Sequence, residues 1–217
     1  MARRDWLRWA PIAGLVWVAL VIVSVALTSD SPGDDDGIVK FVTYFRDSGN
    51  QTKIQVAALV AALGGLVFFW FLAGLRDILR SAEGLWGFGA ALAYASGVAF
   101  VVLLWAATAA GTAFASAADH FDSFVVDAQT VQTAMSLSAM SFWLVGFASV
   151  AAGVMIGAAS AVVLGTGVLP RWFGWTGVVL AVLSVLAVVF LPPLAPLLWV
   201  LIASIVLLGR PAATAAA

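Results

Sequence analysis

Hydrophobic and polar positions are arranged in blocks along the chain, with long apolar runs separated by short polar segments. Six of the runs reach or approach the roughly 20 residues that a helix needs to cross a bilayer. The pattern therefore predicts an all-α integral membrane protein, one domain over residues 1–217, with six transmembrane helices. The predicted spans cover about 9–27, 54–75, 86–115, 140–164, 173–191 and 194–208.

The last two runs are separated by the sequence LPPLAP at 191–196. A single helix over 173–208 would be roughly 54 Å long, whereas the hydrocarbon core is about 30 Å thick. Pro192, Pro193 and Pro196 also remove three backbone donors. We therefore expect a tight hairpin and a short sixth span rather than one kinked helix.

The first run also has features of a secretory signal peptide, because Arg3, Arg4 and Arg8 precede an apolar stretch. That stretch is long for a signal peptide and contains Trp17, and no small-residue cleavage motif follows it. A retained transmembrane helix is the favoured interpretation.

The polar segment between the first two spans contains a short amphipathic pattern with helical spacing. We expect a helix on the outer surface that is capped at its start by Asp35 or Asp36 and ended by Gly49. A second helical stretch is expected around Val126, and the two should fold together as a cap over the spans. The expected contacts are Ile38, Val42 and Phe45 with Phe121, Phe124 and Val125.

Composition supports the bilayer interpretation, since 64% of the residues are hydrophobic and only 10% are charged. With the N-terminus inside, seven of the ten Lys and Arg residues fall on the cytoplasmic side, as the positive-inside rule requires. We expect both termini in the cytoplasm. The cytoplasmic basic residues are Arg3, Arg4, Arg8, Arg76, Arg80, Arg171 and Arg210.

The charged and reactive residues exclude several classes of function. No ionisable residue falls in the middle of a predicted span, which argues against pumps, proton-coupled transporters and voltage sensors. The chain has no Cys and one His, so we expect no disulfide, iron–sulfur cluster, haem or other cofactor. A net charge of −1 gives no basic surface for nucleic acid.

Small residues recur at intervals of four along two of the spans. Such stripes let helices approach closely in lipid. They predict tight packing of the fourth span at Gly157, against either another span or a second protein chain. The partner could be a second copy of this chain or another membrane protein. The stripes are Gly89, Ala93 and Gly97, and Ser149, Gly153, Gly157, Ala161 and Gly165.

A polar track follows the outer half of the third span and the approach to the fourth. Its hydroxyls and amides either join neighbouring helices or line an outward-facing pocket with Trp105 at its floor. In the second interpretation the ligand-binding residues are Trp105, Thr108, Thr112, Ser116, Gln129 and Thr133.

One outer loop combines Asp119, His120 and Asp122. Carboxylates and an imidazole can bind a divalent metal or activate water. Their spacing matches no established ligand motif, and an acidic surface loop with an incidental histidine explains them equally.

Two short sequences carry a resemblance to a known family. They are LPRWFGW at 169–175, where interfacial aromatics precede the fifth span, and YFRDSGNQTK at 44–53 before the second. With the six-span layout, they resemble an uncharacterised domain-of-unknown-function family of small multi-pass actinobacterial membrane proteins. The resemblance implies an integral plasma-membrane protein and carries over no catalytic residue.

The sequence leaves three hypotheses about function. The first is a non-enzymatic membrane module that binds a lipid, a small ligand or a partner protein. The second is a channel or facilitator for an uncharged substrate, which requires a continuous polar path. The third is a membrane enzyme that uses the loop around His120.

Overall fold

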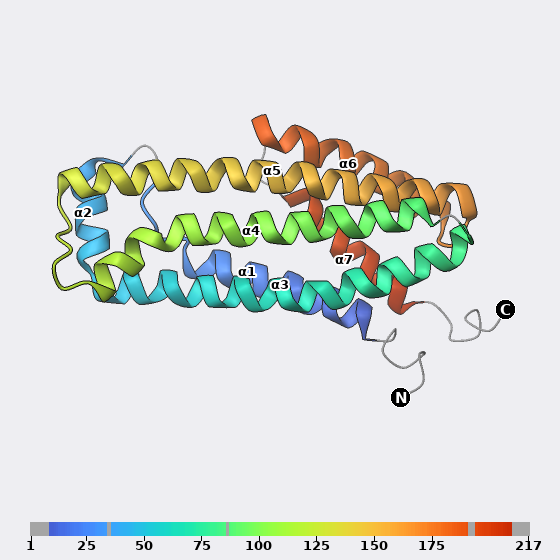
Figure 1. Ribbon diagram of the computed structural model, residues 1–217, viewed down its shortest axis with the longest axis horizontal. Helices are drawn as coiled ribbons and strands as arrows, with labels where there is room; N and C mark the ends of the chain where they lie inside the picture. The colour runs from blue at the N-terminus through green and yellow to red at the C-terminus, as the bar shows by residue number, and fades with distance from the viewer. Residues whose placement is uncertain (1–8, 34–35, 86, 191–193, 210–217) are drawn as a thin grey trace.

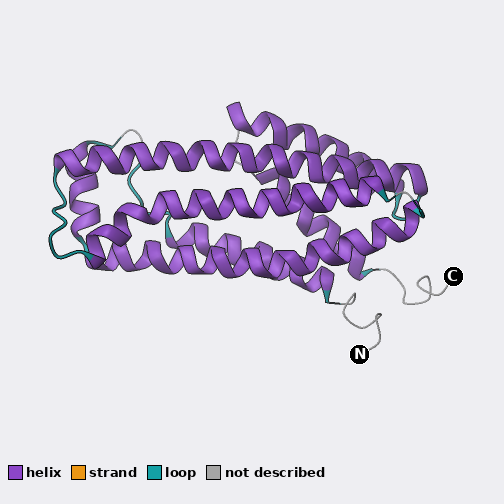
Figure 2. Cartoon of the chain, in the orientation of Figure 1, coloured by secondary structure: helices purple, strands orange, loops and turns teal. Residues whose placement is uncertain are grey.

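The computed structural model describes residues 9–33, 36–85, 87–190 and 194–209, and every regular element in these ranges is an α-helix (Figures 1 and 2). The prediction of an all-α protein is confirmed. The helices are α1 (Ala10–Leu27), α2 (Ile38–Arg46), α3 (Ser48–Glu83), α4 (Phe88–His120), α5 (Ala128–Thr166), α6 (Arg171–Phe190) and α7 (Leu194–Leu208).

Among the described residues, five helices are long and apolar enough to cross a membrane: α1, α3, α4, α5 and α6. The protein is therefore a multi-pass membrane protein. The predicted sixth span corresponds to α7, whose 15 residues extend roughly 22 Å, short of the hydrocarbon thickness of about 30 Å. The structure thus supports five of the six predicted spans.

Three helices are longer than the predicted spans, α3 and α5 by many residues and α4 by a few. α3, α4 and α5 contain 36, 33 and 39 residues, which correspond to roughly 54, 50 and 58 Å. Hydropathy marks only the part of each helix that lies in lipid. The three helices therefore project beyond the bilayer.

The long helices run side by side along the bundle, and α2 lies across one end of them (Figure 1). α1, α6 and α7 cover only part of the length and leave the α2 end free. Contacts close a ring in which α1 packs on α3 and α7, α4 lies between α3 and α5, and α6 lies between α5 and α7.

Aromatic side chains fill the centre of this ring. Trp17 packs on Phe68 with ring centroids 4.6 Å apart. Trp199 lies 5.8 Å from Phe173 and 6.4 Å from Phe71. All five side chains are buried, so side chains occupy the space where a pore would run.

Small residues allow the helices to pack this closely. A Cβ atom added at Gly97 would lie 2.5 Å from Leu72 Cδ2 and 3.0 Å from Met155 Sδ. α5 is the most buried of the spanning helices, since 56% of its most apolar stretch is buried, against 28–33% in the other four. At Gly97, the stripe on α4 therefore serves packing within one chain.

The stripe on α5 is not tight along its whole length, and at Gly157 the approach of α6 is an ordinary van der Waals contact. A Cβ atom there would lie 3.7 Å from the Ala181 Cβ, an ordinary contact. Gly165 has open space around it, and Ala161 is exposed. Of the three glycines in this stripe, Gly153 lies closest to α6.

The end of the bundle at α2 has its own small apolar core. We call α2, residues 121–127 and the helix ends that they cover the α2 cap. Phe45 lies 4.9 Å and Phe124 lies 5.3 Å from the Phe114 ring, centroid to centroid. The expected cap is present. Its buried residues are Phe41, Phe114, Val126, Val131 and Ala134.

The residues that make the α2 cap differ from those predicted. Phe41 is the most buried residue of α2, whereas Ile38 is 38% exposed. Phe121 and Val125 are 64% and 62% exposed, so Phe124 is the one predicted partner from this loop that packs. The larger rings of α2 take the buried positions because they remove more apolar surface from water.

The helix boundaries around the α2 cap also correct the sequence prediction. The N-cap of α2 is Gly37, with no side-chain hydrogen bond, and the Asp36 carboxylate accepts from Gly33 N and Lys40 Nζ instead. α2 ends at Arg46 rather than at Gly49, because Asp47 caps the next helix.

The second predicted outer helix is α5 itself, which begins at Ala128. Val126 precedes it in an extended loop, since Asp127 forms a capping box with Thr130 and starts the helix there. Several sequence predictions lie outside the described residues. They concern Arg3, Arg4, Arg8, Asp34, Asp35, Trp86, Pro192, Pro193 and Arg210.

Candidate functional site

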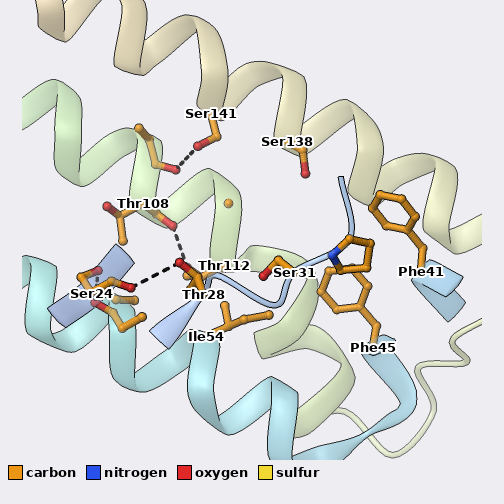
Figure 3. A pocket seen from close by; sticks show the side chains of 15 residues that line it. Ser24, Thr28, Ser31, Phe41, Phe45, Ile54, Thr108, Thr112, Ser138 and Ser141 are labelled. Atoms are coloured by element: carbon orange, nitrogen blue, oxygen red, sulfur yellow. Dashed lines mark hydrogen bonds between the residues drawn. The ribbon is translucent and has the colours of Figure 1, made fainter. Parts of the chain in front are cut away.

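A cavity of about 370 Å³ lies beneath the α2 cap, between α1, α3, α4 and α5 (Figure 3). Its volume falls at the lower end of the roughly 300–1,000 Å³ of small-molecule sites. Phe41, Phe45 and Ile54 form much of its apolar wall, and no charged side chain among the described residues lines it. The polar lining consists of seven hydroxyls, from Ser24, Thr28, Ser31, Thr108, Thr112, Ser138 and Ser141.

The cavity lies where the apolar part of the bundle ends. On α1 its lining residue Thr28 is followed by Ser29 and Asp30. On α3 its lining residue Ile54 follows Lys53, and the next charged residue is Arg76. These independent markers place the cavity at the membrane–water boundary on the α2 side.

Exposed aromatic residues on α5 also place the cavity near the membrane–water boundary. Phe142, Trp143 and Phe147 are 53–63% exposed and lie next to the lining residue Ser141. Rings of this kind concentrate at the level of lipid headgroups. A ligand in the cavity would therefore have its polar end at headgroup depth.

Two hydroxyls of the cavity join neighbouring helices. Ser24 Oγ donates to the Ala57 carbonyl across α1 and α3, at 3.0 Å. Ser141 Oγ donates to the Ala107 carbonyl across α5 and α4, at 2.9 Å. These bonds hold the walls of the cavity together.

Three further hydroxyls bond back to their own helices. Thr28 donates to the Ser24 and Val25 carbonyls. Thr108 donates to Leu104 O at 2.8 Å and Thr112 to Thr108 O at 2.9 Å. Five of the seven lining hydroxyls thus give their protons to the backbone, and their oxygen lone pairs remain able to accept.

Polar contacts fasten the α2 cap above the cavity. Arg46 donates from Nε and Nη2 to the Val126 carbonyl at 3.0 and 2.9 Å. Gln51 Nε2 donates to Phe45 O at 2.7 Å, and Gln55 Nε2 donates to Asp119 Oδ2 at 3.0 Å. Because Phe41 and Phe45 belong to both the cap and the cavity, these bonds fix the roof of the site.

Two carboxylates of the α2 cap are held in their charged forms. A hydrogen bond from the Thr130 backbone N–H lowers the pKa of Asp127, and the Thr130 hydroxyl and the charge of Arg46 act in the same direction. A hydrogen bond from Lys40 lowers the pKa of Asp36, with help from the Gly33 N–H. Both charges lie around the cavity rather than in its lining.

The polar track predicted from sequence divides between two places. Thr108 and Thr112 line the cavity, whereas Trp105, Ser116, Gln129 and Thr133 do not. The Trp105 ring packs edge-on against Phe69 and over Gly65. Gln129 and Thr133 are exposed on α5. A ligand role for these four residues stays a prediction.

Lining residues on α1 and on the first half of α5 are not predicted from the sequence. Ser24 and Thr28 lie one turn apart at the end of the first apolar run, and Ser138 and Ser141 lie near the start of the fourth. Their spacing places each pair near one helix face. Which faces meet is decided by the arrangement of the helices.

Asp119 and His120 lie in the last turn of α4 rather than in the predicted loop, and they form a pair rather than a cluster. His120 Nδ1 lies 3.4 Å from Asp119 Oδ2 and 3.0 Å from the Ser116 carbonyl oxygen, and both side chains are largely exposed. In the part of the chain that the structure describes, no three His, Cys, Asp or Glu side chains come together as a metal site would require.

Comparison with protein-family models, curated proteins and solved structures finds no match for this chain. The resemblance to the actinobacterial membrane protein family therefore stays a prediction. The argument for function rests on the geometry of the cavity.

Proposed function

We propose that the protein is a non-enzymatic plasma-membrane module that binds a small amphipathic ligand in the cavity beneath the α2 cap. The observation that carries the proposal is an uncharged, hydroxyl-lined cavity of about 370 Å³ at the membrane boundary. Burying a charged group there would be costly without a charged partner. A ligand with a polar end and an apolar remainder matches both kinds of wall.

The two other hypotheses receive less support from the geometry. A facilitator needs a continuous polar path, yet Phe71, Phe173 and Trp199 are buried across the centre of the ring. An enzyme using His120 needs that side chain beside a substrate site, and His120 is exposed outside the lining of the cavity.

The proposed topology has six spans, with both termini in the cytoplasm and the α2 cap outside. α7 packs on α1 and α6 and completes the ring, which supports a membrane-crossing role despite its length. A short span is tolerated through local thinning of the bilayer. Arg76, Arg80 and Arg171 lie at the end opposite α2, as the positive-inside rule requires for that end.

Cysteine labelling tests this topology, because the chain has no native Cys. Phe121→Cys, in the α2 cap, is expected to react with a membrane-impermeant maleimide in intact cells. Leu85→Cys, in the turn between α3 and α4, is expected to react only after the membrane is opened, although Leu85 is fully exposed. Labelling of Leu85→Cys from outside would contradict the orientation.

Photocrosslinking tests ligand binding in the native membrane. Benzoylphenylalanine at Ala58 faces the cavity, whereas the same group at Leu59 faces lipid at nearly the same depth. We expect mass spectrometry to find one enriched small adduct at Ala58 and a mixture of bulk lipids at Leu59. The same adduct pattern at both positions would show that the cavity selects nothing.

A further inference from the structure

The hydrogen bonds that the lining hydroxyls already make restrict which polar groups a ligand can place in the cavity. Five lining hydroxyls donate to backbone carbonyls, and none of the described lining side chains carries an N–H group. Ser31 Oγ pairs with Tyr44 Oη at 3.1 Å. Ser138 is the remaining lining hydroxyl. The polar wall therefore offers more acceptors than free donors, so a ligand that only accepts hydrogen bonds finds few partners.

The charge of the lining restricts the ligand further. An ammonium group would donate hydrogen bonds, but it would lie among Ser, Thr, Ala and Phe side chains, with no carboxylate among the described lining residues. A buried charge without a partner is strongly disfavoured. Hydroxyl groups donate hydrogen bonds without carrying charge, and they match this wall.

The arrangement of the helices gives the direction of entry. Around the cavity, α1 packs on α3, α3 on α4, and α4 on α5, whereas α1 and α5 share no substantial contact. Val25 on α1 and Trp143 on α5, each next in sequence or nearly so to a lining serine, are 63% and 54% exposed. An apolar chain leaving the cavity between α1 and α5 would pass directly into lipid.

On the basis of the proposed function, we infer that the ligand is a neutral single-chain amphiphile with a hydroxyl-bearing head, which enters from the adjacent leaflet between α1 and α5. The head donates to the oxygens of Thr108, Thr112 and neighbouring hydroxyls. The first part of the chain lies against Phe41, Phe45 and Ile54, and the rest extends into the bilayer. The small volume suits one head and a short length of one chain.

Two probes with the same chain test the requirement for a donor. Monooleoylglycerol has two free hydroxyls, and methyl oleate has none. Binding to the purified full-length protein is measured by native mass spectrometry over a concentration series. We expect monooleoylglycerol to bind about tenfold more tightly, the factor that corresponds to one or two hydrogen bonds. Equal binding of the two probes, or tighter binding of oleylamine, would overturn the inference.

A pair of variants tests which oxygens accept. Thr108→Val with Thr112→Val removes two acceptors whose protons bond only within α4. The preference for monooleoylglycerol is expected to fall to less than threefold. The control is Thr176→Val, which removes an equivalent hydroxyl bonded within α6 and should leave the preference intact. If the double variant still prefers monooleoylglycerol about tenfold, the ligand does not donate to Thr108 and Thr112, and this part of the inference is wrong.

Filling the cavity separates this inference from the proposed function. Ala58→Trp and Ser138→Trp each place an indole in the lining, and a variant counts only if its unfolding midpoint stays near that of the parent protein. We expect both to reduce the binding of both probes at least tenfold. If they do and the probes bind equally, the cavity binds ligands but the donor requirement is wrong. If binding persists in both, the proposed function fails as well.

Discussion

Gly153→Ala is expected to lower the stability of the protein by about 1–3 kcal/mol, although it adds a single methyl group. The added Cβ would lie 2.8 Å from Val185 Cγ2 and 3.0 Å from the Ala181 carbonyl oxygen. The Val185 side chain can rotate, but the carbonyl belongs to the backbone of α6. The substitution therefore forces α5 and α6 apart along an interface that depends on close packing in lipid.

Gly157→Ala, one turn along the same helix face, is the matched control. Its Cβ would lie at an ordinary contact distance of 3.7 Å from the Ala181 Cβ. Alanine is favoured over glycine in a helix by up to about 1 kcal/mol, so this variant should be as stable as the parent or more so. Unfolding midpoints of both variants in the same detergent measure the difference. A Gly153→Ala protein that unfolds no earlier than Gly157→Ala would contradict the close approach.

The sequence predicts the order of the five long helices because a bilayer demands long apolar runs. It underestimates the lengths of α3 and α5 because both begin well before the apolar part. There, Asp47 and Asp127 cap the helix starts, and Val131 packs beneath α2. Capping and local packing hold these ends, and hydropathy does not register either effect.

The candidate site is predicted only in part. Thr108 and Thr112 are correctly assigned to one helix face from their spacing. Trp105 lies on a similar face, but its ring turns to the space left by Gly65. In a membrane helix, lipid and protein core both accept apolar side chains, so the pattern does not fix the rotation of the helix. Ser24 and Ser141 face the cavity because of how α1 and α5 are rotated about their own axes.

Arg46→Met is expected to release the α2 cap while leaving the transmembrane ring intact. The guanidinium gives two hydrogen bonds to the Val126 carbonyl and lies near the Asp127 charge. Methionine keeps much of the apolar stem but removes both bonds and the charge. Hydrogen bonds from a charged group contribute about 1.5–3 kcal/mol, so amide exchange over residues 38–46 should accelerate by at least about tenfold. Hydrogen-exchange mass spectrometry measures this directly.

Lys53→Met is the control, because Lys53 is an exposed cation near the start of α3. It removes one positive charge without removing the hydrogen bonds that Arg46 makes. It should leave exchange in α2 unchanged. Release of α2 also removes Phe41 and Phe45 from the cavity, so Arg46→Met should weaken ligand capture at Ala58 and leave lipid capture at Leu59 as it was. If Arg46→Met leaves exchange in α2 unchanged, the ring contacts of Phe45 and Phe124 with Phe114 hold the cap without Arg46, and access to the cavity does not depend on this arginine.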